Sequence, residues 1–347
     1  MIGVYLMKFR KRHLAKIKNC YAVNMVNIQG KSHYIFATDD EGPCYSFDAE
    51  TFEQKTVWEK PGGTMSIVPL PKGDGAFLAS RRFMPGFTAL HTEIVRASFI
   101  DNQWKVVKWM DLPYVHRFDI LQRNEQNYFL GCILSSTQEE RAKWNCPGYL
   151  AAASVDDDFS PPKKLKKIAM DMSQNHGYWK FKKDGYDCSL TCCREGVFEV
   201  IPPPAAGEDW TVRKILNVPA SDAVLCDIDN DGIDEMAVIS PFHGNQLFIY
   251  RKTKDNYQEI YRHSEPMDFL HALWGGYLCG KPVFIIGYRA MEKKLFLLSW
   301  EDGRICSQII ETGKGPSNVT VGGGINGQCI LAANRESSEA AVMYVEE

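Results

Sequence analysis

Short apolar runs separated by polar turns follow one another along nearly the whole chain. The stretch from Val224 is typical and reads VLCDIDNDGIDEMAVISPFHGNQLFIYRK: three apolar runs with a tight polar turn and then a polar loop between them. A fourth run usually follows, such as NYQEIYRH from Asn256. The runs are rich in β-branched and aromatic residues and too short for helices, which favours β-strands. The pattern predicts an all-β protein with antiparallel strands.

This four-strand unit recurs seven times. The units start near residues 21, 65, 116, 176, 222, 271 and 318, so six intervals span 318 − 21 = 297 residues and the period is close to 50. Four strands per unit of about 50 residues are typical of a β-propeller blade. We therefore predict one seven-bladed β-propeller domain over residues 1–347. The last unit has room for three strands, so the N-terminal strand within residues 5–18 is expected to close it. Two stacked β-sandwiches are the alternative.

One turn between predicted strands is dense in carboxylates. It reads Asp227-Ile-Asp229-Asn-Asp231-Gly232-Ile-Asp234-Glu235. Alternating carboxylates around a glycine can direct several oxygens at one hard cation such as calcium. The candidate ligands of a structural calcium ion are Asp227, Asp229, Asp231 and Glu235, and a solvated acidic turn is the alternative. The geometry of a blade places this turn on the bottom face of the propeller.

The DxDxDGxDE pattern of this turn resembles the FG-GAP (VCBS-type) repeat of β-propellers. The stretches PFHGN from Pro241, FLHALWGG from Phe269 and GPSN from Gly315 are similar to bacterial FG-GAP proteins related to the propeller of fungal aldos-2-ulose dehydratase. That family eliminates water from keto-sugars such as 1,5-anhydrofructose and has a metal in its propeller. The resemblance implies a metal-dependent carbon–oxygen lyase acting on a carbohydrate. The chain has the length of the propeller alone, without the second domain of the fungal enzyme.

Four of the eight histidines are expected at the same face of the propeller. His116, His176 and His271 lie where the first strand of a unit starts, and His243 lies in a loop between second and third strands. Both places belong to the top face, and the first strands ring the channel. Neutral imidazoles are common ligands of divalent metals. We predict a Mn, Zn, Ni or Mg site held by His176, His243 and His271, with His116 as a further ligand or a base. In the alternative, each histidine only bonds a neighbouring loop.

The same top loops offer cations and aromatic rings. Arginines follow the second strand in three units, at Arg82, Arg289 and Arg335, and a guanidinium offers a planar fork for sugar or carboxylate oxygens. Tyr288 and His116 are candidates for proton transfer. The aromatic residues expected to stack on a sugar are Phe242, Tyr178 and Trp274.

Two functions fit this set. In a lyase, elimination beside a carbonyl needs a base, an electrophile and an acid. The metal, His116 or Tyr288, and the arginines Arg82, Arg289 and Arg335 could supply these roles. The alternative is a propeller that binds a carbohydrate or a protein without catalysis, because a propeller fold alone does not specify function.

Composition excludes some partners. The net charge is −3 and no basic block could follow a phosphate backbone, so we expect no nucleic acid partner. No run approaches the length of about 20 apolar residues that a membrane span needs. The apolar part of the N-terminus is too short for a signal peptide and precedes its basic residues, so we expect a cytoplasmic protein. The 11 scattered cysteines favour reduced thiols.

Overall fold

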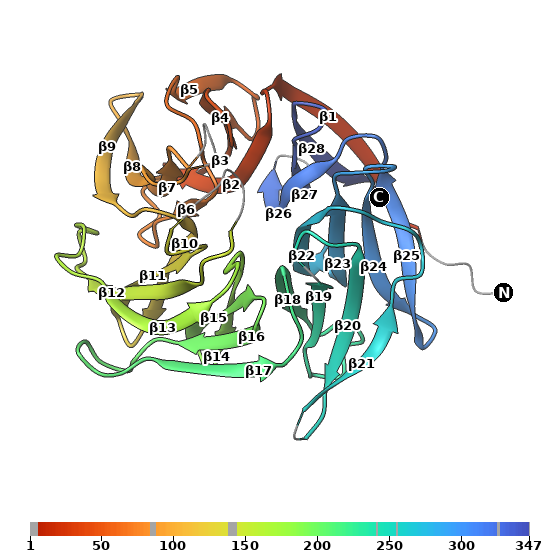
Figure 1. Cartoon of the computed structure of the whole chain (residues 1–347). Helices are drawn as coiled ribbons and strands as arrows, with labels where there is room; N and C mark the ends of the chain where they lie inside the picture. The colour runs from red at the N-terminus through yellow and green to blue at the C-terminus, as the bar shows by residue number, and fades with distance from the viewer. Residues whose placement is uncertain are drawn as a thin grey trace.

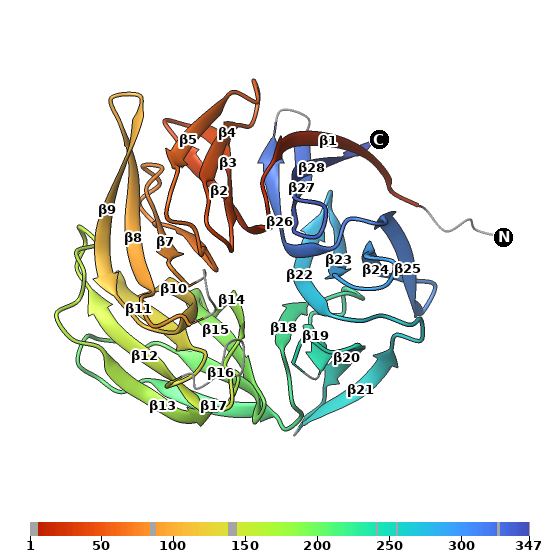
Figure 2. The ribbon, with the colours of Figure 1, turned by 45° about the horizontal axis from the view of Figure 1, so that its top comes forward.

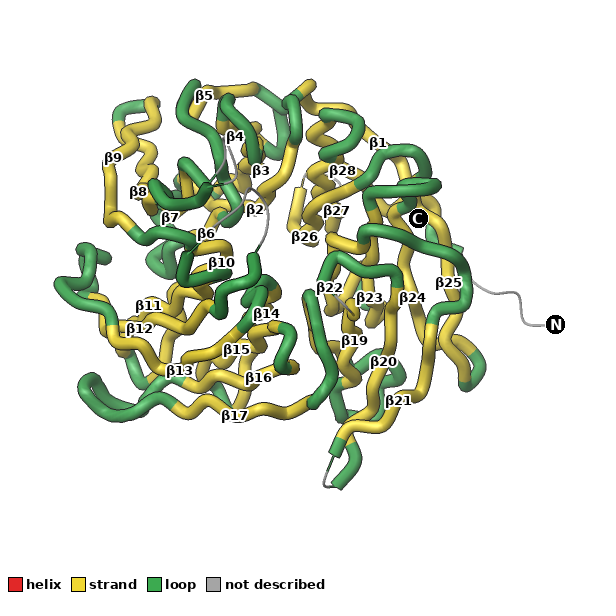
Figure 3. The backbone as a smooth tube through the Cα atoms, viewed as in Figure 1, coloured by secondary structure: helices red, strands yellow, loops and turns green. Residues whose placement is uncertain are grey.

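The chain forms a ring of seven antiparallel sheets around a central channel (Figure 1). The computed structural model describes residues 6–83, 88–137, 144–240, 242–254, 256–324 and 327–346; Pro241 of the PFHGN stretch lies outside them. Strands and loops make up this described part, which contains no helix that could span a membrane (Figure 3). The prediction of an all-β, seven-bladed propeller with four-stranded blades is confirmed.

Each blade is built from consecutive strands. The first three blades are β2–β5 (Cys20–Ile28, Lys31–Thr38, Cys44–Asp48, Gln54–Trp58), β6–β9 (Ile67–Pro69, Phe77–Arg81, Glu93–Ile100, Gln103–Asp111) and β10–β13 (Val115–Arg123, Gln126–Ile133, Gly148–Val155, Lys166–Met172). The next three are β14–β17 (Gly177–Lys183, Tyr186–Cys193, Gly196–Ile201, Thr211–Leu216), β18–β21 (Asp222–Cys226, Glu235–Ser240, Gln246–Lys252, Tyr257–Arg262) and β22–β25 (Leu270–Leu278, Lys281–Tyr288, Leu295–Glu301, Arg304–Glu311). The seventh combines β26–β28 (Pro316–Gly324, Gly327–Asn334, Glu339–Glu346) with β1 (Lys8–Lys16).

The seven inner strands begin within two residues of the starts that the repeat predicts. The core lies between neighbouring sheets, which cover both faces of the middle strands. This explains why a middle strand such as β23 carries a continuous apolar run, Val283–Ile286, instead of alternating polar and apolar residues. All 11 cysteines are free, and most of them are buried in this core.

The N-terminal strand closes the ring as predicted. β1 pairs with β28 along Lys8–Lys16 and forms the outer edge of the seventh sheet (Figure 2). Lys11 on β1 forms ion pairs with Glu311 on β25 and with Glu339 on β28. Burial alone would raise the pKa of Glu339, but hydrogen bonds from Lys11 and Asn334 hold that pKa down to about 2. The closure therefore contains a buried carboxylate with a charged partner in addition to the strand pairing.

We expect Lys11→Met to lower the free energy of unfolding at neutral pH by about 1–3 kcal/mol, because Glu339 would lose a charged partner in a mostly buried position. Urea unfolding measures this change. Lys8→Met, at an exposed position of the same strand, is the matched control and should change stability by no more than about 0.5 kcal/mol. Equal effects of the two substitutions would contradict a role of the Lys11 ion pairs in closure.

Candidate functional site

A recurring irregularity of the inner strands delivers polar side chains to one end of the channel. In β2, β10, β22 and β26 the pairing with the next strand skips one residue near the strand start. Such a bulge redirects the extra side chain out of the sheet. The bulged residues are Tyr21, His116, His271 and Ser317. His176 and Ser221 directly precede β14 and β18 and occupy the corresponding place in their blades.

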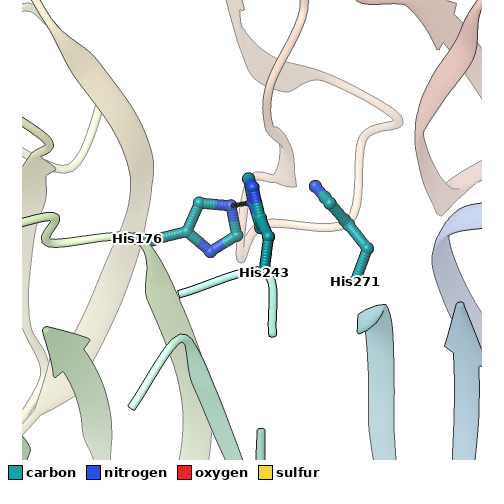
Figure 4. Close-up of side chains that lie close together, drawn as sticks. All are labelled: His176, His243 and His271. Carbon is teal, nitrogen blue, oxygen red and sulfur yellow. Dashed lines mark hydrogen bonds between the residues drawn. The ribbon is translucent and has the colours of Figure 1, made fainter. Parts of the chain in front are cut away.

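Three histidines converge at this end of the channel (Figure 4). One nitrogen from each of His176, His243 and His271 lies within 4.8 Å of the others. The Nε2 atoms of His176 and His243 are 3.1 Å apart. Two nitrogen ligands of one tetrahedral ion, each bonded at about 2.05 Å, lie about 3.3 Å apart. The predicted trio is therefore brought together, and the His176–His243 spacing fits two ligands of one divalent metal.

Backbone carbonyls orient two of these imidazoles. Nδ1 of His176 lies 3.2 Å from the carbonyl oxygen of Ser221, and Nδ1 of His271 lies 2.6 Å from that of Ser317. A carbonyl can only accept, so each Nδ1 carries the proton and donates it. Each Nε2 then carries a lone pair that can accept a hydrogen bond or bind a metal. Metal-ligating histidines are typically fixed by such a bond from the other ring nitrogen.

The loop between β19 and β20 supplies the third imidazole. His243 adopts a positive φ of 45°, and its ring stacks between Phe242 at 4.0 Å and Phe269 at 4.8 Å between ring centroids. These two stacking contacts orient the His243 ring, which lies in a loop and not on a strand. The prediction that Phe242 lies in the site agrees with its place beside His243.

Burial keeps the four histidines neutral. It is the largest cause that lowers the pKa of each of them below the usual 6.5, and the guanidinium of Arg117 lowers all four further. The pKa of His243 is lowered to about 3. Metal ligation needs the neutral imidazole. The cluster is therefore ready to bind a cation at neutral and mildly acidic pH.

Tyr21 and His116 lie against the trio as a second pair. The Tyr21 hydroxyl is 3.3 Å from Nε2 of His116 and 3.2 Å from Nε2 of His271. Burial raises the Tyr21 pKa, so the hydroxyl keeps its proton and donates it to one of these nitrogens. The His116 ring stacks near that of His176, at 4.2 Å between centroids, and its Nδ1 is buried without a hydrogen-bond partner among the described residues. His116 thus lies outside the three-ligand group and beside it.

These side chains line a cavity of about 380 Å³, which we call the histidine cavity. Its walls are largely aromatic, and two arginines that line it form ion pairs: Arg289 with Glu336 at 2.7 Å and Arg335 with Asp39 at 2.5 Å. The guanidinium of Arg289 also lies 4.5 Å from the centre of the Phe269 ring. The volume and the few charged groups on apolar walls are typical of a small-molecule site.

The structure separates the remaining predicted residues from this cavity. Tyr288 ends β23 with its ring in the core between two sheets, near Phe296, whereas its neighbour Arg289 faces the cavity. Successive side chains of a strand point in opposite directions, which explains the difference. Arg82 is exposed and bonds Glu93 away from the cavity.

Tyr178 and Trp274, the other two predicted sugar-stacking residues, also lie outside the histidine cavity. They line a second cavity further along the channel. Tyr178 is the second residue of β14, and Trp274 is the fifth residue of β22. Each further residue along a strand moves a side chain away from the strand start, and so away from the top of the channel.

Some residues of the cavity were not predicted. Tyr21 has the same phase as His116 and His271, so the repeat alignment alone could have identified it. Asp39 and Trp144 carry no such signal, because they come from loops of different length.

The acidic turn lies between β18 and β19, at the other end of β18 from Ser221. Carboxylate oxygens of Asp227, Asp229 and Glu235 lie within 4.8 Å of one another, whereas Asp231 is not part of this group. The guanidinium of Arg251 on β20 forms ion pairs with Asp229 and Glu235. One cation of the chain thus already contacts two of these carboxylates, and a structural calcium ion stays a prediction.

No family model and no curated protein matches the chain. Solved structures of the same fold do. A chain of the mitotic checkpoint complex is 10% identical, with a TM-score of 0.59 over 97% of this chain and 95% of that one. The periplasmic gluconolactonase PpgL of Pseudomonas aeruginosa is 13% identical, with a TM-score of 0.58 over 93% and 91%. Sqt1 of Saccharomyces cerevisiae is 10% identical, with a TM-score of 0.54 over 98% of each chain. At these identities the similarity supports the propeller fold alone, and membership of the FG-GAP family stays a prediction.

The three buried histidines and the half-buried His243 predict acid-sensitive stability in the metal-free protein. Unfolded histidines titrate near 6.5 and the folded ones lower, about 3 for His243, so between these values the unfolded state binds more protons. The free energy of unfolding should then fall as the pH falls, by up to about 1.4 kcal/mol per pH unit for each histidine. Urea unfolding after EDTA treatment, from pH 7 downward, measures the slope. His243→Gln should reduce it and His91→Gln, at an exposed position, should not; a slope unchanged in His243→Gln would contradict this cause.

Proposed function

We propose that the chain is a metal-dependent carbon–oxygen lyase that acts on a keto-sugar in the histidine cavity. The observation that carries the proposal is the group of ring nitrogens of His176, His243 and His271, one from each within 4.8 Å of the others, beside the Tyr21–His116 pair. The resemblance of the sequence to sugar dehydratases supports the same reaction.

The donor set favours one class of metal. Three neutral imidazoles suit zinc or nickel best, whereas magnesium prefers oxygen ligands and retains water. Such an ion, when bound, would polarise the substrate carbonyl and make the neighbouring C–H bond more acidic. With three protein ligands, such an ion would keep a coordination position for substrate or water, as catalytic sites do.

Tyr21 and His116 are placed to move the proton. With His271 committed as a ligand, the Tyr21 hydroxyl would donate to Nε2 of His116 alone. Tyr21 could then take the proton from the carbon beside the carbonyl while its own proton passes to His116. The C–H bond and the C–O bond of the next carbon break, a C=C bond forms, and the departing hydroxide regains the proton from His116 through Tyr21 and leaves as water. Positioned groups of this kind contribute about 10²- to 10⁴-fold to a rate.

The remaining walls suit a sugar. The rings of Phe242 and Phe269 offer apolar faces on either side of His243, and Arg289 and Arg335 line the same cavity. These groups can orient an oxygen-rich ligand while its C–H surface packs on the aromatic rings.

A spectroscopic assay tests the proposed reaction. Elimination from 1,5-anhydrofructose forms a conjugated enone, which absorbs in the near ultraviolet. We expect absorbance to rise with the metal-loaded chain, to stop after EDTA treatment, and to return when zinc, nickel or manganese is added. Saturable binding of the sugar without any absorbance change, in the presence of each of these metals, would favour the alternative of a non-catalytic binding propeller.

A further inference from the structure

A second cavity occupies the channel beyond the histidine cavity. It measures about 430 Å³ and is lined by the inner strands of all seven blades. Arg117 lies at its boundary with the histidine cavity: its guanidinium donates to the carbonyl of Met65, at 2.8 Å, and to Oδ1 of Asn318 on the far side of the ring, also at 2.8 Å. We call this space the Asp222 cavity.

Asp222 contributes a buried carboxylate without an ion-pair partner among the described residues. The residue is 7% exposed, and its carboxylate accepts hydrogen bonds from the backbone N–H groups of Ala223, at 3.0 Å on Oδ1, and of Tyr178. Burial raises its pKa to about 7, and Arg117 lowers it only in part. A buried carboxylate left without a strong donor is costly, so a donor from a ligand or water would stabilise it.

The other charged groups of this cavity already have hydrogen-bond partners within the chain. Lys180 donates to Asp119 at 2.8 Å, and Arg117 has its two oxygen partners. Counted together, Arg117 and Lys180 balance Asp119 and Asp222 in formal charge. The walls therefore carry no excess formal charge that would favour a charged ligand over a neutral ligand with hydroxyl groups.

Two indoles provide apolar surface. Trp179 and Trp274 meet edge to face, with ring centroids 6.4 Å apart, and both line the cavity while partly exposed. Gly276 lies against the Trp274 ring, where an added Cβ would come within 2.8 Å of the indole, so the backbone leaves room for this ring. Exposed indole faces inside a channel are suited to the C–H surface of a polar ring.

We propose that the Asp222 cavity binds a neutral polyhydroxylated ligand, a sugar or polyol of monosaccharide size, whose hydroxyl donates to Asp222 and whose apolar face packs on Trp274. This site is distinct from the histidine cavity and does not depend on the reaction proposed there. Its volume lies within the range of about 300–1,000 Å³ for small-molecule pockets.

Ligand-observed NMR on the EDTA-treated full chain tests the proposal. The probes are methyl α-D-glucopyranoside, methyl β-D-galactopyranoside and myo-inositol. None of them has a carbonyl group, so none can undergo the elimination proposed for the histidine cavity. We expect saturable binding of at least one probe in the millimolar range. Asp222→Asn and Trp274→Ala should each weaken it about tenfold, the loss expected for a hydrogen bond to a charged group or for an aromatic contact surface. Trp274→Ala also removes packing and could fail to fold. In that case the nearly isosteric Asp222→Asn still tests the proposal.

Two controls separate this site from the histidine cavity. Asp111→Asn, at an exposed position, should leave binding unchanged. His243→Ala should also leave binding unchanged, although it is expected to abolish turnover in the histidine cavity. Absence of saturable binding for all three probes would overturn the proposal, because the cavity would then hold water alone. Binding lost in His243→Ala but retained in Asp222→Asn would overturn it as well, since the ligand would occupy the histidine cavity.

Discussion

His271→Ala is expected to reduce the affinity for zinc, nickel or manganese by more than about a hundredfold, because even residues that only orient a ligand are worth about ten- to a hundredfold. The change removes one of the three imidazoles of the group and leaves the carbonyl oxygen of Ser317 without the Nδ1–H donor of His271. Competition with a chromophoric chelator measures the affinity, and elemental analysis of the purified chain measures occupancy. Both should fall together.

The matched control is His91→Ala, because His91 is exposed and lies in a different surface pocket. It should keep the metal affinity of the unchanged chain. Should His271→Ala keep full affinity while substitution of Asp229 reduces it, the metal would belong to the acidic turn and the histidine trio would have only a structural role.

Tyr21→Phe is expected to lower kcat by about 10²- to 10⁴-fold while leaving the metal content unchanged, since a positioned proton donor contributes about that much. The substitution keeps the ring, whose edge lies against His271 with centroids 5.2 Å apart, and removes only the hydroxyl between His116 and His271. Steady-state kinetics on 1,5-anhydrofructose, together with elemental analysis, separate a loss of chemistry from a loss of metal.

Tyr288→Phe provides the control for this prediction. Tyr288 is buried in the core between two sheets and does not line the histidine cavity. Its substitution should leave kcat within about twofold, a change of roughly 0.4 kcal/mol in the barrier. A large loss of kcat in Tyr288→Phe with normal activity in Tyr21→Phe would reverse the two assignments.

The repeat determined how much of the site could be predicted. Because every blade places the same part of its first strand at the top of the channel, the shared phase of His116, His176 and His271 sufficed to bring them together. His243 could be added from its loop. The fold itself followed from the period of about 50 residues and from the short last unit.

Other features depend on details that the repeat does not encode. Whether Tyr288 or Arg289 faces the cavity depends on the direction of a single residue at the end of β23. Arg251 lies 16 residues beyond Glu235, and only the pairing of β19 with β20 brings its guanidinium onto the acidic turn. Asp222 looks like an ordinary strand residue in the sequence, and its lack of an ion-pair partner becomes visible only when the seven inner strands are assembled.

The most direct test of the metal centre is anomalous diffraction from crystals of the zinc- or nickel-loaded chain, recorded at the absorption edge of the metal. We predict one anomalous peak at the top of the channel, about 2.0–2.2 Å from the Nε2 atoms of His176, His243 and His271. A peak at the acidic turn with none among the three histidines would contradict this assignment.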